Sequence, residues 1–336
     1  MAATNIEVWQ LGTVVEVQTI ATGIRRVVLE PSLPRKAEPG SHIDVMVTID
    51  GHKDRRSYSI VESSDDGTRL VISVRKAPLT RGGSLFIHGL RVGEKLEITQ
   101  PLQNFPLRIG ARRYILLAGG IGITAIINMA RVLRNLASDY TLVYAGRSRA
   151  AMAYLDELRQ LHGGNLVVHI DDEGTPLDVN ELVASATEDT ELYMCGPIRL
   201  MDAVRRTWME RELSYPNLRF ETFGNSGWYD PEEFIVRVPG LGLEVPVGPG
   251  RSMLEALEDA GADMMFDCRK GECGLCEVKI LALEGAVDHR DVFYSARQKK
   301  ATEKMACCVS RAVTSKTGLA AEASATGPAV VTIEVS

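Results

Sequence analysis

Three cysteines in the C-terminal part of the chain have the spacing of a metal-cluster site. Cys268, Cys273 and Cys276 follow the pattern C-x4-C-x2-C, and the adjacent pair Cys307 and Cys308 comes later. Three thiols so spaced, with a distant fourth, are typical of a plant-type [2Fe–2S] cluster. Neighbouring side chains of an extended segment point to opposite faces, so only one thiol of the pair can face the irons. The sequence therefore predicts an iron–sulfur cluster whose fourth ligand lies in this pair.

The residues between these cysteines also suit a cluster. Gly271 and Gly274 can adopt positive φ at little steric cost, and their missing side chains let backbone N–H groups approach the cluster sulfurs. A zinc site is one alternative, but zinc sites usually contain two C-x2-C pairs and this chain has only one. Buried structural thiols are the other alternative. Disulfides are not expected, because nothing marks the chain as secreted.

A second group of residues suits a nucleotide. The apolar run Tyr114–Ala118 leads into Gly-Gly-Ile-Gly-Ile-Thr at 119–124, and apolar residues then recur with helical spacing. Backbone N–H groups at such a helix start favour a pyrophosphate, although glycine-rich turns also serve tight packing. A later strand, Glu191–Met194, ends in Cys195-Gly196-Pro197, at the carboxyl edge where parallel sheets bind ligands. Small residues there leave room for a flat ring, although Cys195 could equally be a buried packing residue.

Two N-terminal segments suit a flavin. Arg56-Ser57-Tyr58-Ser59 closes an expected strand, and Gly82-Gly83-Ser84 stands at an expected helix start. A tyrosine can stack on an aromatic ring while its hydroxyl contacts a ribityl chain. Arginine and a Gly-Gly-Ser helix start both suit a phosphate. Taken singly, each segment has an ordinary alternative, with Arg56 as a surface charge and the glycines as a simple loop.

Three successive kinds of element would position these residues. Short alternating strands over 1–108, separated by Gly and Asp turns, predict a β-barrel, and strands alternating with helices over 109–226 predict a parallel α/β sheet. A linker over 227–232 precedes a small domain over 233–336, with a helix at Ser252–Ala260 that begins in a capping box. Strands are expected at Thr13–Val17, Arg25–Leu29, His42–Ile49, Arg69–Arg75, Lys95–Thr99, Tyr114–Ala118, Thr141–Ala145, Leu166–Ile170, Glu191–Cys195, Glu233–Val238, Leu243–Val247 and Ala329–Val335.

Composition limits the possible partners and location. The 336 residues include 38 Lys and Arg against 44 Asp and Glu, a formal net charge of -6 that argues against nucleic acid as a partner. The opening MAATNIEVWQL has no basic region followed by an apolar stretch, so we expect no signal peptide. No run of eighteen apolar residues is present, and we expect no membrane span. Free cysteines belong in a reducing compartment, which makes the cytoplasm the expected location.

The order of these motifs resembles one known family. Arg-x-Tyr-Ser, Gly-Gly-Ser, Gly-Gly-Ile-Gly-Ile-Thr, Cys-Gly-Pro and the cysteine loop occur in the order of the phthalate dioxygenase reductase family, which includes the reductases of vanillate demethylase and other Rieske-type oxygenase systems. The resemblance runs from about residue 10 to residue 335. It implies a multidomain β, α/β and α+β protein, in which a flavin-binding β-barrel and an NAD(H)-binding α/β domain precede a plant-type [2Fe–2S] ferredoxin domain of the β-grasp class.

The resemblance also implies an activity. NADH would give a hydride to FMN, and single electrons would pass through the [2Fe–2S] cluster to a terminal Rieske-type oxygenase acting on an aromatic acid or similar small substrate. The complex with the oxygenase would be transient and the reductase a monomer. A reductase for a haem monooxygenase is the nearest alternative, and a non-catalytic redox sensor is another. A flavin reductase that releases free reduced flavin would not need the ferredoxin domain.

Site residues follow from the resemblance by position. The flavin is assigned to Arg56, Ser57, Tyr58, Ser59, Val74, Arg75, Lys76, Gly82, Gly83 and Ser84. The nicotinamide nucleotide is assigned to Gly119, Gly120, Gly122, Thr124, Arg147, Ser148, Arg149, Cys195, Gly196 and Pro197. The cluster ligands would be Cys268, Cys273, Cys276 and Cys308, because the family's fourth ligand stands two residues before Ser-Arg-Ala, here at 310–312. No catalytic acid or base is implied, because stacking and orientation carry the hydride transfer. Gln103 and Ala125 stand where the family often has asparagine and proline.

Overall fold

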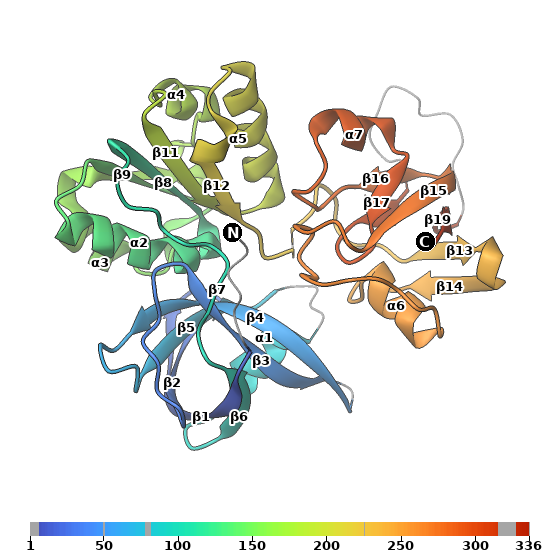
Figure 1. Ribbon diagram of the computed structural model, residues 1–336, viewed down its shortest axis with the longest axis horizontal. Helices are drawn as coiled ribbons and strands as arrows, with labels where there is room; N and C mark the ends of the chain where they lie inside the picture. Colours follow the sequence, from blue (N-terminus) through green and yellow to red (C-terminus); the bar gives the residue numbers. More distant parts are fainter. Residues whose placement is uncertain (1–6, 50, 78–81, 225, 315–326, 336) are drawn as a thin grey trace. The chain divides into compact units, whose positions relative to one another are not determined.

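The computed structural model describes residues 7–49, 51–77, 82–224, 226–314 and 327–335, apart from the side chain of His52 (Figure 1). Its internal contacts divide the chain into two compact units. Unit 1 comprises Met1–Gly196 and Ala203–Glu221, and unit 2 comprises Pro197–Asp202 and Thr222–Ser336. No helix in the described residues is long and apolar enough to cross a membrane.

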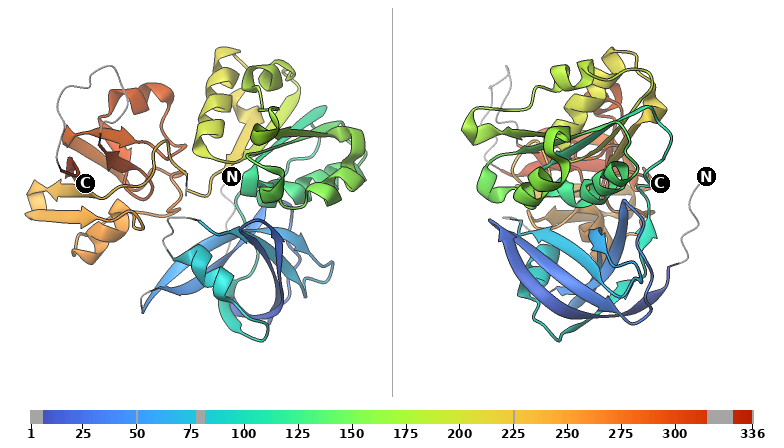
Figure 2. Two further views of the ribbon diagram at one scale, coloured as in Figure 1. Left: turned by 180° about the vertical axis from the view of Figure 1, so that it is seen from behind. Right: turned by 90° about the vertical axis from the view of Figure 1, so that its left-hand side faces the viewer.

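Unit 1 begins with an antiparallel barrel, as expected. Its strands are β1 (Trp9–Ala21), β2 (Ile24–Pro31), β3 (Ser41–Ile49), β4 (His52–Ser63), β5 (Leu70–Arg75), β6 (Lys95–Thr99) and β7 (Leu102–Gln103). They lie in the order β4-β5-β2-β1-β6-β3-β7, and β4 also pairs with β3, which closes the sheet. Inward residues such as Val27, Ile43 and Ile72 are fully buried. The helix α1 (Gly83–Gly89) packs against β3 and β5 and adds Ile87 to this core (Figure 2).

The second half of unit 1 is a parallel sheet with helices on both faces. Its elements are β8 (Arg113–Gly119), α2 (Ile123–Asn135), β9 (Tyr140–Gly146), α3 (Leu155–His162), β10 (Leu166–Ile170), α4 (Val179–Ala184), β11 (Thr190–Cys195), α5 (Ile198–Glu210) and β12 (Leu218–Glu221). The first residues of α5, up to Asp202, are assigned to unit 2. All strands are parallel, and their order across the sheet is β10-β9-β8-β11-β12. The chain builds the sheet outward in one direction from β8 and in the other from β11, so the topological switch point lies between these two strands. Parallel sheets of this kind bind ligands where the strand order reverses, at the carboxyl ends of the two strands.

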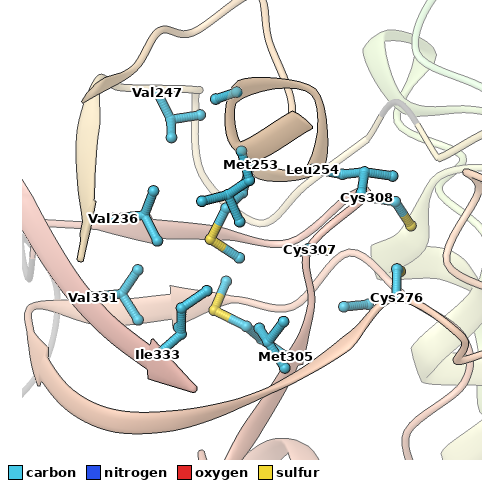
Figure 3. Close-up of a cluster of buried hydrophobic side chains, with 14 of the residues drawn as sticks. Val236, Val247, Met253, Leu254, Cys276, Met305, Cys307, Cys308, Val331 and Ile333 are labelled. Carbon is cyan, nitrogen blue, oxygen red and sulfur yellow. The ribbon is translucent and has the colours of Figure 1, made fainter. Parts of the chain in front are cut away.

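Unit 2 contains a small mixed sheet with its own hydrophobic core. Its elements are β13 (Phe234–Val238), β14 (Leu243–Val247), α6 (Met253–Asp259), β15 (Glu277–Glu284), β16 (Ala286–Asp288), α7 (Ala296–Ala301), β17 (Lys304–Ala306), β18 (Arg311–Val313) and β19 (Ala329–Glu334). The main sheet has the order β14-β13-β19-β15-β17, and β16 pairs with β18. Side chains from β13, β19 and α6 form the core, and Cys276, Cys307 and Cys308 lie at its edge (Figure 3).

Short 3-10 helices connect these elements, and they are η1 (Gly120–Gly122), η2 (Arg149–Ala151), η3 (Gly163–Asn165), η4 (Asp171–Glu173), η5 (Tyr215–Asn217) and η6 (Pro239–Leu241). The three expected fold classes are confirmed, and every expected strand is present within a few residues of its predicted bounds. The capping box is confirmed as well, because Ser252 Oγ accepts from Glu255 N at 3.1 Å and Glu255 Oε2 accepts from Ser252 N at 2.8 Å. The loop expected before the last strand lies largely at 315–326, outside the described residues.

Candidate functional site

The Cys268 sulfur in unit 2 is surrounded by backbone donors. The N–H groups of Lys270, Glu272 and Cys273 each lie 3.4 Å from Cys268 Sγ. Burial raises the pKa of the Cys268 thiol, and these three donors act in the opposite direction by stabilising negative charge on the sulfur. Backbone N–H groups around a thiolate are what a cluster ligand requires, and this observation fits an iron–sulfur site.

The two glycines of the loop have the backbone conformation that the sequence predicts. Gly271 has φ 78° and Gly274 has φ 77°. A Cβ at Gly271 would lie 2.7 Å from a Val309 methyl group, and one at Gly274 would lie 2.4 Å from the Phe293 ring. The Gly271 carbonyl also accepts from Val292 N at 3.0 Å. Packing from 292–309 therefore fixes the loop in a shape that only glycine permits at these two positions.

The remaining three thiols of unit 2 lie together. Cys276, Cys307 and Cys308 are all buried, and hydrogen bonds from Cys307 and then Cys308 lower the pKa of Cys276 to about 3. The same contacts raise the pKa values of Cys307 and Cys308. Figure 3 shows the Cys308 sulfur directed toward Cys276. Because both thiols of the pair contact Cys276, the choice of Cys308 as the fourth ligand stays a prediction.

The arrangement of the thiols agrees with a two-iron cluster. In the part of the chain that the structure describes, no three His, Cys, Asp or Glu side chains are placed to hold one metal ion. A [2Fe–2S] cluster needs only two thiolates at each iron, and so its ligands need not converge on one point. One thiol surrounded by N–H groups and a second in contact with the Cys307-Cys308 pair agree with that requirement.

The predicted flavin residues of the barrel converge on one place. Arg56 and Tyr58 lie on β4, and a Cβ at Gly83 would lie 2.8 Å from Arg56 Cγ and 3.1 Å from Tyr58 Oη. Ser84 Oγ accepts from Ala77 N at 3.2 Å, which joins the start of α1 to the segment after β5. Gly83 thus lets the start of α1 approach Arg56 and Tyr58 closely, and the Arg56 guanidinium itself pairs with Asp54 at 2.5 Å. An arginine and a tyrosine hydroxyl beside this glycine are residue types that suit the terminal phosphate of a flavin.

Ser57 and Ser59, on the same strand, have other contacts. Ser57 Oγ donates to the buried Asp44 carboxylate, which also pairs with Arg55. Ser59 Oγ donates to Glu221 Oε2 at 3.1 Å, and both residues are buried. Ser57 therefore has a structural contact within the barrel, whereas Ser59 connects the flavin strand to the carboxyl edge of the parallel sheet.

The glycine-rich turn meets the end of β11 at this edge. The register pairs Ala118 with Cys195, and a Cβ at Gly122 would lie 2.1 Å from the Cys195 carbonyl oxygen. Gly120 has φ 54° and nothing within 4 Å of its missing Cβ. Thr124 is buried, and its Oγ1 donates to Ile121 O at 2.9 Å. Gly122 thus permits close packing of two strand ends, and Gly120 leaves open space for a ligand.

Glu221 is the residue that our sequence analysis missed. It is 4% exposed, it pairs with Cys195 in the β11–β12 register, and it accepts the Ser59 hydrogen bond. It therefore lies between the predicted flavin strand and the predicted nicotinamide residues. No motif marks it, and its one signal is its position at the end of a short fifth strand, directly before the Gly- and Asn-rich segment.

The segment after β9 carries two arginines, Arg147 and Arg149, and the second pairs with a carboxylate. Arg149 Nε and NH2 contact Glu173 Oε1 and Oε2 at 2.8 and 2.5 Å. The Arg147 carbonyl accepts from Asp172 N at 3.0 Å, which brings the acidic turn η4 beside the end of β9. The predicted adenosine end of the nucleotide site therefore contains fixed charges of both signs.

Three family models match successive parts of the chain. They are described as an oxidoreductase FAD-binding domain over residues 12–106, an oxidoreductase NAD-binding domain over 116–206 and a 2Fe-2S iron-sulfur cluster binding domain over 236–313. These matches and the geometry above define the class of protein, an oxidoreductase with a flavin-binding, a nicotinamide-nucleotide-binding and a 2Fe-2S domain.

Whole-chain relatives give the family. The carnitine monooxygenase reductase subunit of Acinetobacter baumannii is 34% identical over 274 residues, which is 81% of this chain and 85% of the relative. The solved structure of phthalate dioxygenase reductase superposes with a TM-score of 0.70 at 29% identity and covers 97% of this chain and 98% of that one. This chain belongs to the phthalate dioxygenase reductase family.

A larger protein contains a similar unit. An intact type IV self-sufficient cytochrome P450 monooxygenase matches with a TM-score of 0.64 at 34% identity. The match covers 97% of this chain, and the chain spans only 41% of the length of that protein. A region similar to nearly all of this chain therefore forms about two fifths of a cytochrome P450 monooxygenase.

Proposed function

We propose that this chain is the reductase component of a two-component Rieske oxygenase system that acts on an aromatic acid or similar small substrate. When bound, a nicotinamide supplies two electrons together, a flavin can pass them on singly, and a [2Fe–2S] cluster accepts one at a time. The observation that carries the proposal is the Ser59–Glu221 contact, which joins the flavin strand to the carboxyl edge beside Cys195. The chain's task would be to orient its cofactors.

The proposed roles of the residues are these. Arg56, Tyr58, Ser59, Val74, Arg75, Lys76, Gly82, Gly83 and Ser84 would hold the flavin, with Ser57 supporting their strand. Gly119, Gly120, Gly122, Thr124, Arg147, Ser148, Arg149, Cys195, Gly196 and Pro197 would form the nicotinamide nucleotide site, and Cys268, Cys273, Cys276 and Cys308 would ligate the cluster. The proposed domains are 1–108, 109–226 and 233–336, joined by the linker 227–232.

We propose FMN as the flavin. The convergence of Gly83, Arg56 and Tyr58 supports a terminal phosphate at the start of α1, as does membership of this family. Treating the released flavin with phosphodiesterase before chromatography tests the choice, because only an adenine-containing flavin changes its mobility. A change in mobility would show that the flavin is FAD.

We propose NADH rather than NADPH as the donor. The turn η4 carries Asp171, Asp172 and Glu173 beside the end of β9, and carboxylates repel a 2′-phosphate. Glu173 also forms an ion pair with the Arg149 guanidinium, which leaves that group less available to a 2′-phosphate. Comparing kcat/KM for the two nucleotides with ferricyanide as the acceptor tests this, and a clear preference for NADPH would contradict it.

The electron acceptor would be a separate oxygenase, bound transiently by a monomeric reductase in the cytoplasm. The relatives of this chain include reductase subunits of oxygenase systems. Small interfaces between electron-transfer proteins are generally transient. The second candidate is a haem monooxygenase, which the match to a P450 fusion protein favours. Reconstitution with a Rieske oxygenase and, separately, with a haem monooxygenase distinguishes the two, because this chain should support substrate oxidation by only one of them.

A further inference from the structure

The outer face of β3 carries a buried histidine and a buried aspartate that the roles proposed above do not use. His42 and Asp44 alternate with Ile43 and Val45, which belong to the barrel core, so the two polar side chains lie on the opposite face of the strand. His42 is 3% exposed and Asp44 is fully buried. Burying an imidazole and a carboxylate costs free energy unless both have polar partners.

Polar side chains surround the Asp44 carboxylate. It accepts from Ser57 Oγ and pairs with Arg55 NH2. Its Oδ1 lies 3.9 Å from His42 Nε2. The Arg55 side chain, which is 43% exposed, also pairs with the surface carboxylate of Glu7 at 2.8 Å. Asp44 can therefore stabilise a positive charge on the His42 imidazole, and its partners reach the surface of the protein.

His42 also lies beside the flavin strand. The register of β3 and β4 pairs His42 with Ser59. Directly opposite side chains of an antiparallel pair share one face of the sheet, with their Cβ atoms about 4.5–5.5 Å apart. Ser59 Oγ in turn donates to Glu221 Oε2 at 3.1 Å. A row of buried polar groups thus runs from Glu221, at the carboxyl edge of the parallel sheet, to Asp44.

The elements packed against β3 and β4 bring further charged groups to this region, and α1 lies on the opposite, core face of β3. They are Arg55 on β4, Glu97 on β6 with its partner Lys53 on β4, Glu221 on β12, and Arg131 on α2 with its partner Glu157. β7 contributes the uncharged Gln103. The Glu97 and Arg131 ion pairs are each neutral, and so the charges that act on His42 are those of Glu221 and of Asp44 with Arg55.

The proposed electron transfer leaves a proton in this buried region. NADH gives up a hydride, which is two electrons and a proton, whereas a [2Fe–2S] cluster accepts electrons one at a time. Each NADH therefore yields NAD⁺, two electrons that pass on singly through the cluster, and one proton that must leave by another route. Histidine is the side chain that takes up and gives up a proton most readily near neutral pH.

We propose that His42 accepts this proton through the Ser59 hydroxyl, and that Asp44 holds the imidazole in place and stabilises its charged form. The proton then passes to solvent on the side of the exposed Arg55–Glu7 pair, which restores the neutral imidazole for the next NADH. His42 and Asp44 are thus positioning residues for proton release, and neither takes part in the hydride transfer. The proposal rests on the proposed function, because the proton comes from NADH.

The test uses full-length protein containing flavin and cluster, with the variant His42→Gln, which stays polar and cannot hold the proton. Stopped-flow absorbance times two steps separately: bleaching of the flavin by one equivalent of NADH, and reduction of cytochrome c by the protein so reduced. Bleaching should stay within twofold of the wild type, and cytochrome c reduction should be at least about tenfold slower, because a positioned proton acceptor contributes about 10²–10⁴-fold. His169→Gln, on β10, is the matched control and should match the wild type in both steps.

Further readouts separate proton transfer from a structural role. The wild-type rate of cytochrome c reduction should rise between pH 5.5 and pH 8, as the imidazole loses the proton that blocks it, and the rate of His42→Gln should stay flat. Asp44→Asn removes the charge that stabilises the imidazolium, and so it should move this rise to lower pH. An indicator dye counts the protons taken up when the protein is reduced by light without NADH, and this number should be lower in His42→Gln by up to one per flavin.

The possible failures are distinguishable. Cytochrome c reduction in His42→Gln within twofold of the wild type over this pH range, with full flavin content, would overturn the proposal. Bleaching and cytochrome c reduction slowed by one factor, with unchanged proton uptake, would give His42 a structural role and overturn it as well. If His42→Gln holds no flavin, the Asp44→Asn profile decides, since a shift supports the proposal and an unchanged midpoint overturns it. Wild-type protein that holds no flavin, or that NADH does not bleach, would overturn the proposed function and this proposal with it.

Discussion

At the residue scale, Glu221 is a buried carboxylate with a defined contact to the flavin strand. Replacing it by Gln keeps the size and an acceptor for the Ser59 hydroxyl, and removes the charge. A hydrogen bond to a charged group contributes about 1.5–3 kcal/mol, and so we expect Glu221→Gln to slow flavin reduction by NADH roughly tenfold to hundredfold. Stopped-flow absorbance of the flavin measures this step directly.

A control and a double variant separate this effect from general damage. Glu244→Gln removes an exposed carboxylate that pairs with Arg237 in unit 2, and it should leave flavin reduction unchanged. Ser59→Ala and the double variant complete a thermodynamic cycle with Glu221→Gln. Additive losses of rate would mean that Ser59 and Glu221 act independently, and the contact would then have no role in orienting the flavin strand.

The cluster ligands give a second test at this scale. Cys273→Ser should abolish the absorbance of the cluster and the reduction of cytochrome c, because a hydroxyl is a poor substitute for a thiolate ligand. Bleaching of the flavin by NADH should continue, since the flavin residues lie in unit 1. Loss of bleaching in folded protein would show that this division of roles is wrong.

Cys307 and Cys308 form a matched pair for the fourth ligand. Both are buried in a turn and both contact Cys276, and the predicted plant-type ligand set needs only one of them. We expect Cys308→Ser to lose the cluster and Cys307→Ser to keep it, with iron and sulfide content as the measurement. A cluster that survives Cys308→Ser and is lost in Cys307→Ser would reverse the assignment.

Site residues that lie close together in the sequence could be predicted, whereas those that meet only through the fold could not. The thiols Cys268, Cys273 and Cys276 lie on one loop, and their spacing in sequence carries their geometry. Glu221 reaches Ser59 across 162 positions through a sheet register and a contact between two modules. Nothing in its local sequence encodes that register, which is why the structure was needed to find it.

At the scale of elements, the two glycines of the β8–α2 turn should respond differently to alanine. Gly122→Ala would place a methyl group against the Cys195 carbonyl, and forced overpacking of this kind costs about 1–3 kcal/mol. We expect Tm of unit 1 to fall by about 2–12 °C, as measured by calorimetry. The turn and β11 must separate to accept the methyl group, so nucleotide binding should weaken as well.

Gly120→Ala is the matched variant. Its methyl group would meet nothing within 4 Å, and the positive φ alone costs about 1 kcal/mol. We therefore expect a smaller loss of stability than in Gly122→Ala, together with a higher KM for NADH, because the methyl group faces the open side of the turn. Equal losses of stability in the two variants would contradict the distinct roles assigned to the two glycines.

The helix α3 gives a pH-dependent prediction. His162 ends this helix, and its Nδ1 lies 2.7 Å from Tyr140 Oη on β9. Burial, and then Arg134 and Arg131, lower its pKa in the folded state below the ordinary value of 6.5. The His162 imidazole therefore takes up a proton more readily in the unfolded chain than in the folded one. Its contribution to the free energy of unfolding is present above pH 6.5 and is lost as the pH falls below that value.

We expect Tm of unit 1 to fall between pH 7.5 and pH 5.5, and to fall less in His162→Gln. The slope from one group is at most about 1.4 kcal/mol per pH unit. His169 is the matched control, because it lies on β10 and can be replaced by Gln in the same way. An identical pH profile in wild type and His162→Gln would remove His162 as the cause.

Elements with local signals were predictable, and those held by distant contacts were not. The start of α6 follows from Ser252 and Glu255, three residues apart, whose side chains satisfy each other's backbone. The Arg of the Ser-Arg-Ala motif marks a position in the family, but its physical role appears only in the structure. Arg311 is buried and donates to the carbonyls of Glu232, Val247, Gly248 and Arg251, which no pattern in the sequence indicates.

At the scale of the whole molecule, the chain has two compact units with separate cores. The core of unit 2 includes Cys276, Cys307 and Cys308 together with residues of β13, β19 and α6. A cluster ligated by 268–276 and by the segment after β17 would cross-link two distant parts of unit 2, and such binding contributes directly to folding stability. The flavin residues of unit 1 have no such cross-link.

The variant Cys268→Ser, Cys276→Ser should therefore destabilise one unit only. Calorimetry is expected to show two unfolding transitions, one for each unit. The midpoint temperature of the unit 2 transition should fall by at least about 10 °C, because a domain of about 100 residues that loses about 2 kcal/mol of stability shifts by roughly this amount. Flavin fluorescence reports the unfolding of unit 1, and its midpoint should stay within about 2 °C of the wild type, since a loss confined to unit 2 leaves the free energy of unit 1 unchanged. If both midpoints fell together, the units would unfold cooperatively, and the cluster would stabilise the whole chain rather than the domain that binds it.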